Sequence, residues 1–251
     1  MLLAVVVLVA ASGTGSAPST ANSRTAATAL PGPTVPASTA TATTTTTPRL
    51  KHLVATATVP LVDVYEAPGQ EVPVRQLAHP TQLLNAPLVF LVREGDEDDE
   101  WLNVLLPVRP NGSTGWIRQS DVSLERHDYR ILVELGAHKL TLWKREEVLA
   151  QEPIGVGTVE TPTPGGLYYT KGLYPDLNPD GPYGPYAYGL SGFSEVHNNF
   201  RGGDGAMAIH GTNDPSSIGT DASNGCIRMH NEAIMRLVSI LPIGVPVEIR
   251  A

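Results

Sequence analysis

The segment from Ile209 to Met229 reads Ile-His-Gly-Thr-Asn-Asp-Pro-Ser-Ser-Ile-Gly-Thr-Asp-Ala-Ser-Asn-Gly-Cys-Ile-Arg-Met and holds the only cysteine of the chain. A thiol attacks a carbonyl carbon as the thiolate, so a catalytic cysteine needs a neighbour that accepts its proton. His210 is the candidate base for Cys226, because an imidazole titrates near neutral pH. Gly225 permits a tight turn beside the thiol, and the amides around Gly225 and Cys226 could bind an oxyanion.

A purely structural interpretation of these two residues is also available. A lone cysteine is usually a small buried hydrophobe, and a lone histidine is usually a polar residue with a local hydrogen bond. The neighbours of Cys226 favour the catalytic interpretation, because they form a polar, glycine-flanked setting that a structural cysteine would not need. These neighbours are Gly211, Ser223, Asn224, Gly225 and Arg228.

Two runs in this segment, His-Gly-Thr-Asn-x-Pro-x-x-Ile-Gly and Ser-x-Gly-Cys-Ile-Arg-Met-His-Asn, closely resemble the signature of the YkuD-type L,D-transpeptidases of bacterial cell walls. The resemblance covers about residues 129–249 and implies a β-sandwich catalytic domain. In that family the cysteine is acylated by the L-centre carbonyl of a peptidoglycan stem tetrapeptide. The acyl group then passes to an amine of a neighbouring stem.

By motif position, the resemblance makes Cys226 the nucleophile, His210 the base and the Gly211 carbonyl a group that orients the imidazole. Asn224 stands where many members of the family carry a second histidine, and an amide can donate a hydrogen bond but cannot shuttle a proton. Arg228 would hold the cysteine loop or a substrate carboxylate. The candidate oxyanion and substrate-binding residues are Gly225, Ser223, Asn224, Arg228, Thr212 and Tyr188.

The composition of the chain limits its partners. Its 251 residues, 41% of them apolar, suffice for one or two folded domains, and we expect two. The net charge is −8 and no basic patch stands out, so nucleic acid is not an expected partner. One cysteine excludes an intramolecular disulfide. No spacing of histidines or acids suggests a metal site, and we expect no cofactor.

The N-terminal fifth of the chain differs in composition from the rest. Residues 1–17 begin with a short apolar run and read as an export signal, truncated in that it lacks a basic start. Residues 18–50, rich in Ser, Thr, Pro and Ala, read as a disordered linker. We therefore expect an exported protein, extracellular or in the cell wall, with the N-terminal segment as a candidate membrane tether.

Residues 51–125 contain short β-rich runs separated by Pro, Gly and Asn turns, which predict a small barrel. The runs are 57–65, 88–92, 101–106 and 114–118. The pieces Val-Tyr-Glu-Ala-Pro-Gly at 64–69, Trp-Leu-Asn-Val-Leu at 101–105 and Gly-Trp-Ile-Arg at 115–118 resemble a bacterial SH3-like domain.

Residues 126–251 are the predicted catalytic domain, with strands at 129–135, 140–143 and 148–156. The stretch 167–200 holds six of the eight tyrosines and reads as a long loop. We expect it to form a lid or cleft wall whose tyrosines contact the stem peptide. After Cys226, Asn231 is the expected cap of a short helix, and 245–249 alternates as a last strand.

The sequence as a whole predicts a mostly β protein with a small SH3-like barrel ahead of a β-sandwich catalytic domain and one short helix after the cysteine. The implied activity is cross-linking of stem peptides, or exchange of the terminal D-amino acid, through a cysteine thioester. The expected partners are a tetrapeptide donor and an amine acceptor, with covalent inhibition by carbapenem-type β-lactams. The alternatives are an L,D-carboxypeptidase or other cysteine wall peptidase, and a non-catalytic cell-wall-binding protein.

Overall fold

The fold is that of a computed structural model, which describes residues 51–81, 85–176, 178–198 and 204–251. The predicted export signal at 1–17 and linker at 18–50 lie outside the described residues. Among the helices of the described part, none has the length and apolar character needed to cross a membrane.

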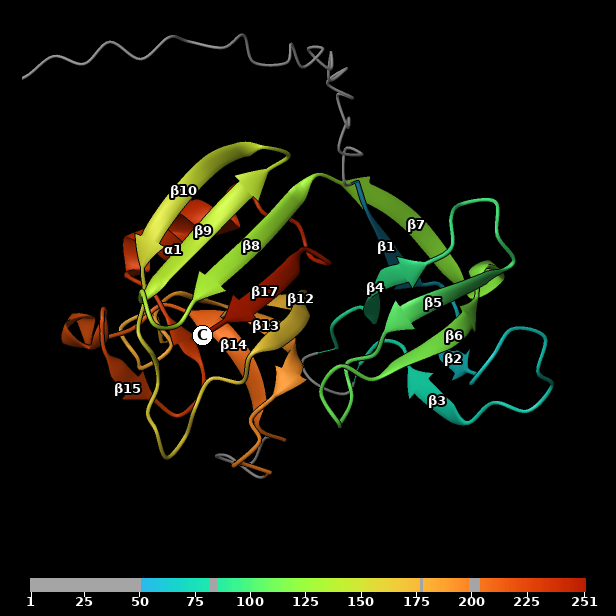
Figure 1. The fold of residues 1–251 in the computed structure, drawn as a ribbon, viewed down its shortest axis with the longest axis horizontal. Helices are drawn as coiled ribbons and strands as arrows, with labels where there is room; N and C mark the ends of the chain where they lie inside the picture. Colours follow the sequence, from blue (N-terminus) through green and yellow to red (C-terminus); the bar gives the residue numbers. More distant parts are fainter. Residues whose placement is uncertain (1–50, 82–84, 177, 199–203) are drawn as a thin grey trace, which may run out of the picture. The chain divides into compact units, whose positions relative to one another are not determined.

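The first half of the described chain forms a five-stranded antiparallel sheet in the spatial order β6-β5-β4-β1-β7 (Figure 1). Its strands are β1 (His52–Ala57), β4 (Val89–Glu94), β5 (Trp101–Leu105), β6 (Thr114–Arg118) and β7 (Val122–His127), with the 3-10 helix η1 (Gln119–Asp121) before β7. A separate hairpin is formed by β2 (Leu61–Val64) and β3 (Arg75–Ala78). Alternate side chains such as Val62, Phe90 and Ile117 point into one hydrophobic cluster.

The predicted strands at 88–92, 101–106 and 114–118 coincide with β4, β5 and β6 within a few residues. The run at 57–65 is instead divided between β1 and β2, with Pro60 in the break, and proline has no N–H with which to continue a ladder. The SH3-like character of this part and the domain limits 51–125 and 126–251 remain predictions.

The second half forms a mixed, curled sheet of eight strands in the order β10-β9-β8-β17-β12-β13-β14-β16 (Figure 1). The strands are β8 (Tyr129–Glu134), β9 (Lys139–Lys144), β10 (Glu147–Pro153), β12 (Gly166–Pro175), β13 (Tyr186–Phe193), β14 (Ala206–His210), β16 (Ile227–Arg228) and β17 (Pro246–Arg250). Strand β17 runs parallel to β8 and β16 runs parallel to β14, whereas the other neighbours are antiparallel.

Smaller elements surround the cysteine. Strands β11 (Val156–Gly157) and β15 (Asp221–Ser223) pair in parallel, and the 3-10 helix η2 (Pro215–Ser217) lies between β14 and β15. Helix α1 (Asn231–Val238) follows the cysteine and packs Ile234 and Leu237 into the core of the eight-stranded sheet. A mostly β chain with a short helix after Cys226 is therefore confirmed.

Helix α1 begins one residue away from the predicted arrangement. The residue at the N-cap position is His230, and it makes no side-chain capping bond. Asn231 is the first helical residue, and its side-chain oxygen accepts the backbone N–H of Thr212 at 2.8 Å. The asparagine therefore ties the helix to the segment that follows β14 rather than capping its own first turn.

Half of the stretch predicted as a long loop, 167–200, belongs to strands. It contains nearly all of β12 and the whole of β13, and six consecutive residues of β13 are buried. Its tyrosines are structural where their hydroxyls find backbone acceptors: Tyr168 donates to Gly165 O at 3.0 Å and Tyr188 to Leu241 O at 2.8 Å. The prediction of a loop is wrong here, because aromatic residues with such partners fit a buried strand.

Tyr169 joins the two sheets. Its ring is fully buried against Leu91 and Leu105 of the five-stranded sheet, and its hydroxyl donates to the Val89 carbonyl oxygen at 2.8 Å. The neighbouring sheets therefore share apolar surface as well as a hydrogen bond, within a stretch, 47–251, that forms one compact unit.

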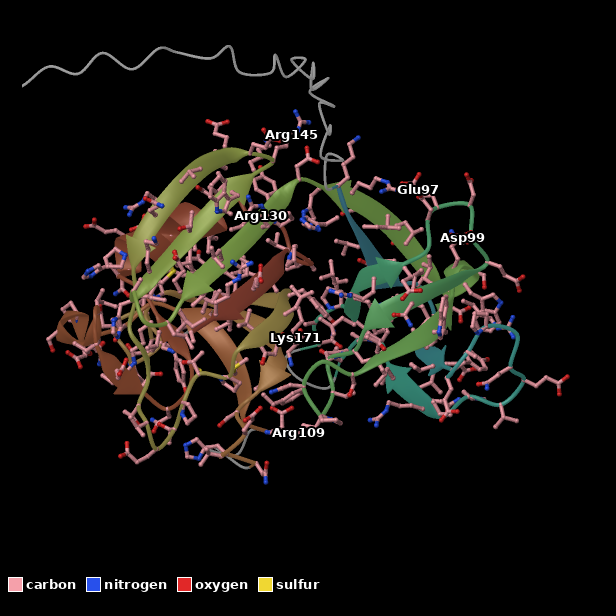
Figure 2. The ribbon with its side chains drawn as sticks, viewed as in Figure 1. Glu97, Asp99, Arg109, Arg130, Arg145 and Lys171 are labelled. Atoms are coloured by element: carbon pink, nitrogen blue, oxygen red, sulfur yellow. The ribbon has the colours of Figure 1, made fainter. Side chains whose placement is uncertain are left out.

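Arg109 forms a second link, at the edge of the five-stranded sheet (Figure 2). Its guanidinium donates to three backbone carbonyl oxygens between β13 and β14, those of Ser194 (2.7 Å), His197 (3.0 Å) and Asp204 (3.0 Å). Asn111 exchanges two hydrogen bonds with the backbone of Phe193, at 2.8 and 2.9 Å. The first half of the chain thus holds the segment that leads into β14.

Candidate active site

Cys226 lies between Gly225 and strand β16. Because Ile209 pairs with Ile227 and His210 with Arg228 in the parallel ladder of β14 and β16, Cys226 stands opposite Ala208. Gly225 has a φ of +107°, a conformation that a residue with a side chain rarely adopts. The tight turn predicted at this glycine is therefore present, directly before the thiol.

Ser223 holds the cysteine loop in this shape. Its buried hydroxyl donates to the Cys226 carbonyl oxygen at 2.5 Å and accepts the Gly225 N–H at 3.1 Å. The Ser223 carbonyl oxygen in turn accepts the hydroxyl of Thr161 at 3.0 Å and the N–H of Thr158 at 3.2 Å. The loop is thus fixed from within and from the 158–163 turn.

His210 ends strand β14, and only 3% of its surface is exposed. Its Nδ1 lies 2.5 Å from the Gly211 carbonyl oxygen. A carbonyl can only accept a hydrogen bond, so Nδ1 carries the proton and Nε2 is left as the basic nitrogen. The ring of Tyr183 packs edge-on against the imidazole, with centroids 4.9 Å apart and an interplanar angle of 67°.

Burial keeps both groups neutral. It lowers the pKa of His210 to about 4, the Gly211 bond and Asp176 acting in the opposite direction and the positive charge of Arg228 acting in the same one. Burial raises the pKa of the Cys226 thiol, while a backbone hydrogen bond with Ala208 and the charge of Arg228 partly oppose it. The resting pair is therefore a neutral imidazole and a thiol.

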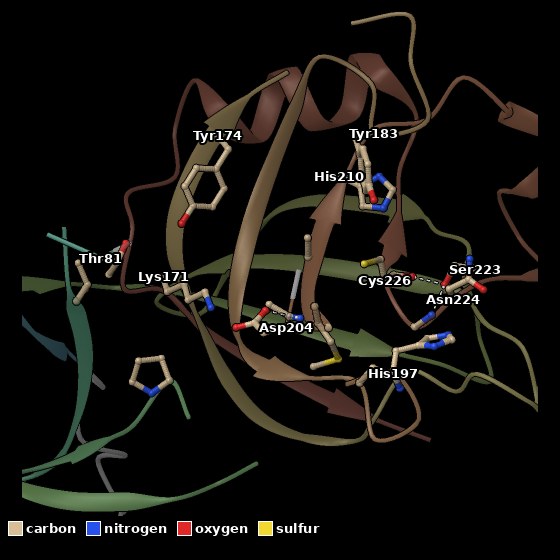
Figure 3. Close-up of a pocket in the computed structure, with 18 of the residues that line it drawn as sticks. Thr81, Lys171, Tyr174, Tyr183, His197, Asp204, His210, Ser223, Asn224 and Cys226 are labelled. Atoms are coloured by element: carbon tan, nitrogen blue, oxygen red, sulfur yellow. Dashed lines mark hydrogen bonds between the residues drawn. The ribbon is translucent and has the colours of Figure 1, made fainter. Parts of the chain in front are cut away.

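A cavity of about 800 Å³ opens over the thiol (Figure 3). His210, Cys226, Ser223, Asn224, Gly225 and Arg228 line it together, so the structure brings six of the predicted residues to one place. Other lining residues come from the first half of the chain, among them Gln76, Thr81 and Pro87. A cavity of this volume has the usual size for a small-molecule or peptide site.

Arg228 and Asn224 both line this cavity, and their polar side-chain groups make no hydrogen bond or ion pair with another described residue. Asn224 is exposed, and Arg228 is partly buried. No carboxylate of a described residue lies within 4 Å of the Arg228 guanidinium. Arg228 can therefore offer its donors to a bound anion as well as its charge to the cysteine and the histidine.

Two predicted substrate contacts are wrong in this structure. Tyr188 is 1% exposed, packs in the core of the eight-stranded sheet and uses its hydroxyl on Leu241 O, so it does not reach the cavity. Thr212 is buried as well, and its hydroxyl oxygen accepts the N–H of Asp214 at 3.0 Å. Neither residue is among the described residues that line the cavity over the thiol.

The predicted oxyanion hole also needs revision. The Gly225 N–H already donates to the Ser223 hydroxyl, so it is not available to a substrate oxygen. The Cys226 N–H, by contrast, has no hydrogen-bond acceptor among the described residues. Cys226 itself is therefore the better candidate donor of the two.

The sequence-based prediction missed several residues of the cavity wall, among them Tyr174, Tyr183 and Lys171. Tyr174 and Tyr183 line it, and the signal for them was the tyrosine-rich stretch, which did not reveal which rings turn inward. Lys171 lines it from β12, and a single lysine in that stretch carried no signal.

No group of three or more His, Cys, Asp or Glu side chains in the described part of the chain could hold a metal ion.

The protein is a β-sheet protein in which a cysteine and a buried, neutral histidine share one cavity. Such a pair is a thiol site suited to acyl transfer. The family model of the YkuD L,D-transpeptidase catalytic domain matches residues 128–249. This part of the chain is therefore similar to the catalytic domain of that family.

Curated relatives also match the chain. The putative L,D-transpeptidases YkuD of Bacillus licheniformis and of Bacillus subtilis are each 42% identical to it over 121 residues, which is 48% of this chain and 65% of each relative. The chain thus spans a little under two thirds of the length of these relatives. An L,D-transpeptidase structure from Mycobacterium smegmatis has 16% identity and a TM-score of 0.41, covering 76% of this chain and 99% of that one.

Proposed function

We propose that the protein is a cysteine-dependent L,D-transpeptidase that cross-links peptidoglycan stem peptides. The observation that carries the proposal is the shared cavity of Cys226 and His210, two residues within the part of the chain that the L,D-transpeptidase family model matches. The donor is a stem tetrapeptide, the acceptor is an amine of a second stem, and the reaction needs no cofactor. The enzyme would act outside the cell, at the wall, with the N-terminal segment as export signal or tether.

Acylation starts from the neutral pair. Nε2 of His210 takes the thiol proton as the sulfur of Cys226 attacks the carbonyl carbon between the third stem residue and the terminal D-alanine. The negative charge on the carbonyl oxygen is stabilised by the Cys226 N–H. Collapse of this intermediate breaks the C–N bond, and the imidazolium returns its proton to the departing amine of D-alanine, leaving a thioester.

The thioester is resolved by the acceptor. The acceptor amine attacks the thioester carbonyl, its surplus proton passes to His210, and the C–S bond breaks to regenerate the thiol. If the acceptor is a D-amino acid, the product is an exchanged tetrapeptide, and if it is water, the product is a tripeptide. Arg228 favours the thiolate during each cycle, since its positive charge lowers the pKa of Cys226.

Carbapenem-type β-lactams should acylate the same thiol. The sulfur would attack the lactam carbonyl, the strained C–N bond would open, and the nitrogen would take up the proton. The adduct therefore adds the full mass of the β-lactam to the protein.

The test is mass spectrometry of products formed from a disaccharide tetrapeptide. We expect dimers that have lost one D-alanine, formed by the wild type and by His230→Gln but not by Cys226→Ala, and greatly reduced with His210→Gln. His230 is the matched control, because it is an exposed histidine outside the thiol cavity. Tripeptide monomers alone would indicate the hydrolase instead. Unchanged substrate with no β-lactam adduct would refute the enzymatic proposal.

A further inference from the structure

Lys171 occupies a β-bulge that turns it toward the thiol cavity. Thr170 pairs with Leu190 and Gly172 pairs with the adjacent Gly189, so Lys171 is the extra residue of β12 in this ladder. A bulge re-aims the side chain that it carries. Lys171 lines the cavity and is seen there in Figure 3, on β12 and across the cavity from Cys226.

The ammonium of Lys171 has no anionic partner in the protein. No carboxylate lies within 4 Å of it, and all 25 aspartates and glutamates of the chain belong to the described residues. The side chain instead packs over the ring of Phe193, with Nζ 5.1 Å from the centroid. Asp204 attracts it only from a greater distance, and burial lowers the pKa of Lys171. A bound carboxylate would offset this cost of burial and hold the lysine charged.

The strands place Lys171 and Cys226 on one row across the sheet. Gly172 pairs with Gly189, Gly189 pairs with Ala208, and Ala208 stands opposite Cys226. Three strand spacings separate the ends of this row, about 14 Å between backbones.

The lysine side chain shortens the remaining gap. A Cβ built on Gly189 would lie 3.7 Å from Cε of Lys171, so the side chain leans one strand toward the thiol. The ammonium is therefore two strand spacings, roughly 10 Å, from Cys226.

Small side chains leave room in the cavity between these two residues. Ala208 lines it and offers only a methyl group. Gly189 is buried beneath the Tyr174 ring, which lies 2.9 Å from where a Gly189 Cβ would stand and lines the cavity in its place. An extended peptide could lie across the strands here, and roughly 10 Å corresponds to about three of its residues.

We propose that Lys171 binds a carboxylate of the donor stem peptide, about 10 Å from the carbonyl that Cys226 attacks. This inference rests on the proposed transpeptidase function. The terminal D-alanine carboxylate lies next to the attacked carbonyl, too close for this lysine, and two other carboxylates of a stem peptide lie within that reach. One is the free α-carboxylate of a second residue linked through its side chain, and the other is the side-chain carboxylate of a diamino-diacid third residue.

The test measures equilibrium binding of three tetrapeptide donors to protein carrying Cys226→Ala, by calorimetry. One donor is unmodified, one is amidated at the second residue and one is amidated at the third-residue side chain. We expect Lys171→Met to weaken binding of the unmodified donor on the order of tenfold. We further expect it to abolish the preference for the acid at one of the two positions. Lys171→Arg should retain most of the affinity, and Lys144→Met, an exposed lysine of β9, should change nothing.

The variants also separate a local effect on the thiol from loss of a binding site. In protein that keeps Cys226, Lys171→Met should react with iodoacetamide, a neutral reagent, at the wild-type rate. Unchanged binding of the unmodified donor, equal binding of all three donors by the wild type, or slowed alkylation would each overturn the inference. Binding requires no turnover, so a missing cross-linked product would refute the transpeptidase proposal and leave a carboxylate-dependent affinity standing.

Discussion

Acid should destabilise this fold through His210. Burial lowers the pKa of His210 in the folded chain from its ordinary 6.5 to about 4, so the unfolded chain binds the proton more readily than the folded one. The contribution of this histidine to stability is therefore complete above pH 6.5 and is lost as the pH falls toward 4. At about 1.4 kcal/mol for each pKa unit, a depression of about 2.5 units corresponds to roughly 3 kcal/mol. The side chain is 3% exposed, so solvent does little to reduce this value.

The assay is urea unfolding of the full chain at pH 7 and pH 4, followed by tryptophan fluorescence, for the wild type and for His210→Gln. The loss of unfolding free energy between the two pH values should be about 3 kcal/mol smaller in the variant. His52, whose pKa burial also lowers to about 4, is present in both proteins and cancels from the difference. His230→Gln serves as the control, because this histidine is exposed.

An equal loss in the wild type and in His210→Gln would refute the reasoning. It would mean that the imidazole titrates alike in the folded and unfolded chain. The proposed resting state would then no longer be uniform, since an imidazole with its ordinary pKa of 6.5 is only about three quarters neutral at pH 7. An NMR titration of the ring protons would locate that pKa directly, and we expect a midpoint near 4.

Three substitutions test the cysteine loop and the join between the sheets. Ser223→Ala removes an acceptor from Gly225 and a donor to Cys226, so it should cost about 1–3 kcal/mol in urea unfolding and slow β-lactam acylation; unchanged acylation would contradict the role of the serine. Gly225→Ala places a side chain at a φ of +107° and should cost about 1–3 kcal/mol, with acylation slower than in the wild type. Tyr169→Phe leaves the buried Val89 carbonyl without its donor and should lower stability by about 1–3 kcal/mol, whereas a change below measurement error would show that water replaces the hydroxyl.

The chemistry of the site was predictable because it is concentrated in a short stretch of chain. His210, Ser223, Gly225, Cys226 and Arg228 lie within 209–229, and the parallel pairing of β14 with β16 brings its two ends together. The residue types alone state which group attacks and which accepts the proton. The pairing that unites them could be inferred only through the resemblance, because a two-residue strand such as β16 has no periodicity to read.

The errors arose where burial decides the role of a residue. Tyr188 and Tyr183 look alike in a Gly- and Pro-rich stretch, yet Tyr188 lies in the core and Tyr183 packs on the imidazole of His210. Local pattern cannot separate them, because strand β13 is buried along most of its length and shows no alternation. The place of Lys171 in the cavity could not be predicted for a related reason. The direction of its side chain depends on a β-bulge, which is set by the register of β12 and β13.

The walls contributed by the first half of the chain were also beyond prediction. Gln76 and Thr81 line the thiol cavity across more than a hundred residues of sequence. Such contacts follow from how the two sheets pack together, and the pattern of residues in either segment does not indicate them.

The contacts of Arg109, Asn111 and Tyr169 affect how the chain unfolds on heating and where it can be truncated. A fragment that began at residue 128, where the family match starts, would expose the Tyr169 ring to water and release the carbonyls that Arg109 holds. The smallest piece able to fold and keep its cavity is therefore longer than the family's own boundaries. Heating the whole protein should give a single calorimetric transition for both sheets, because neither sheet can unfold without exposing buried surface of the other to water.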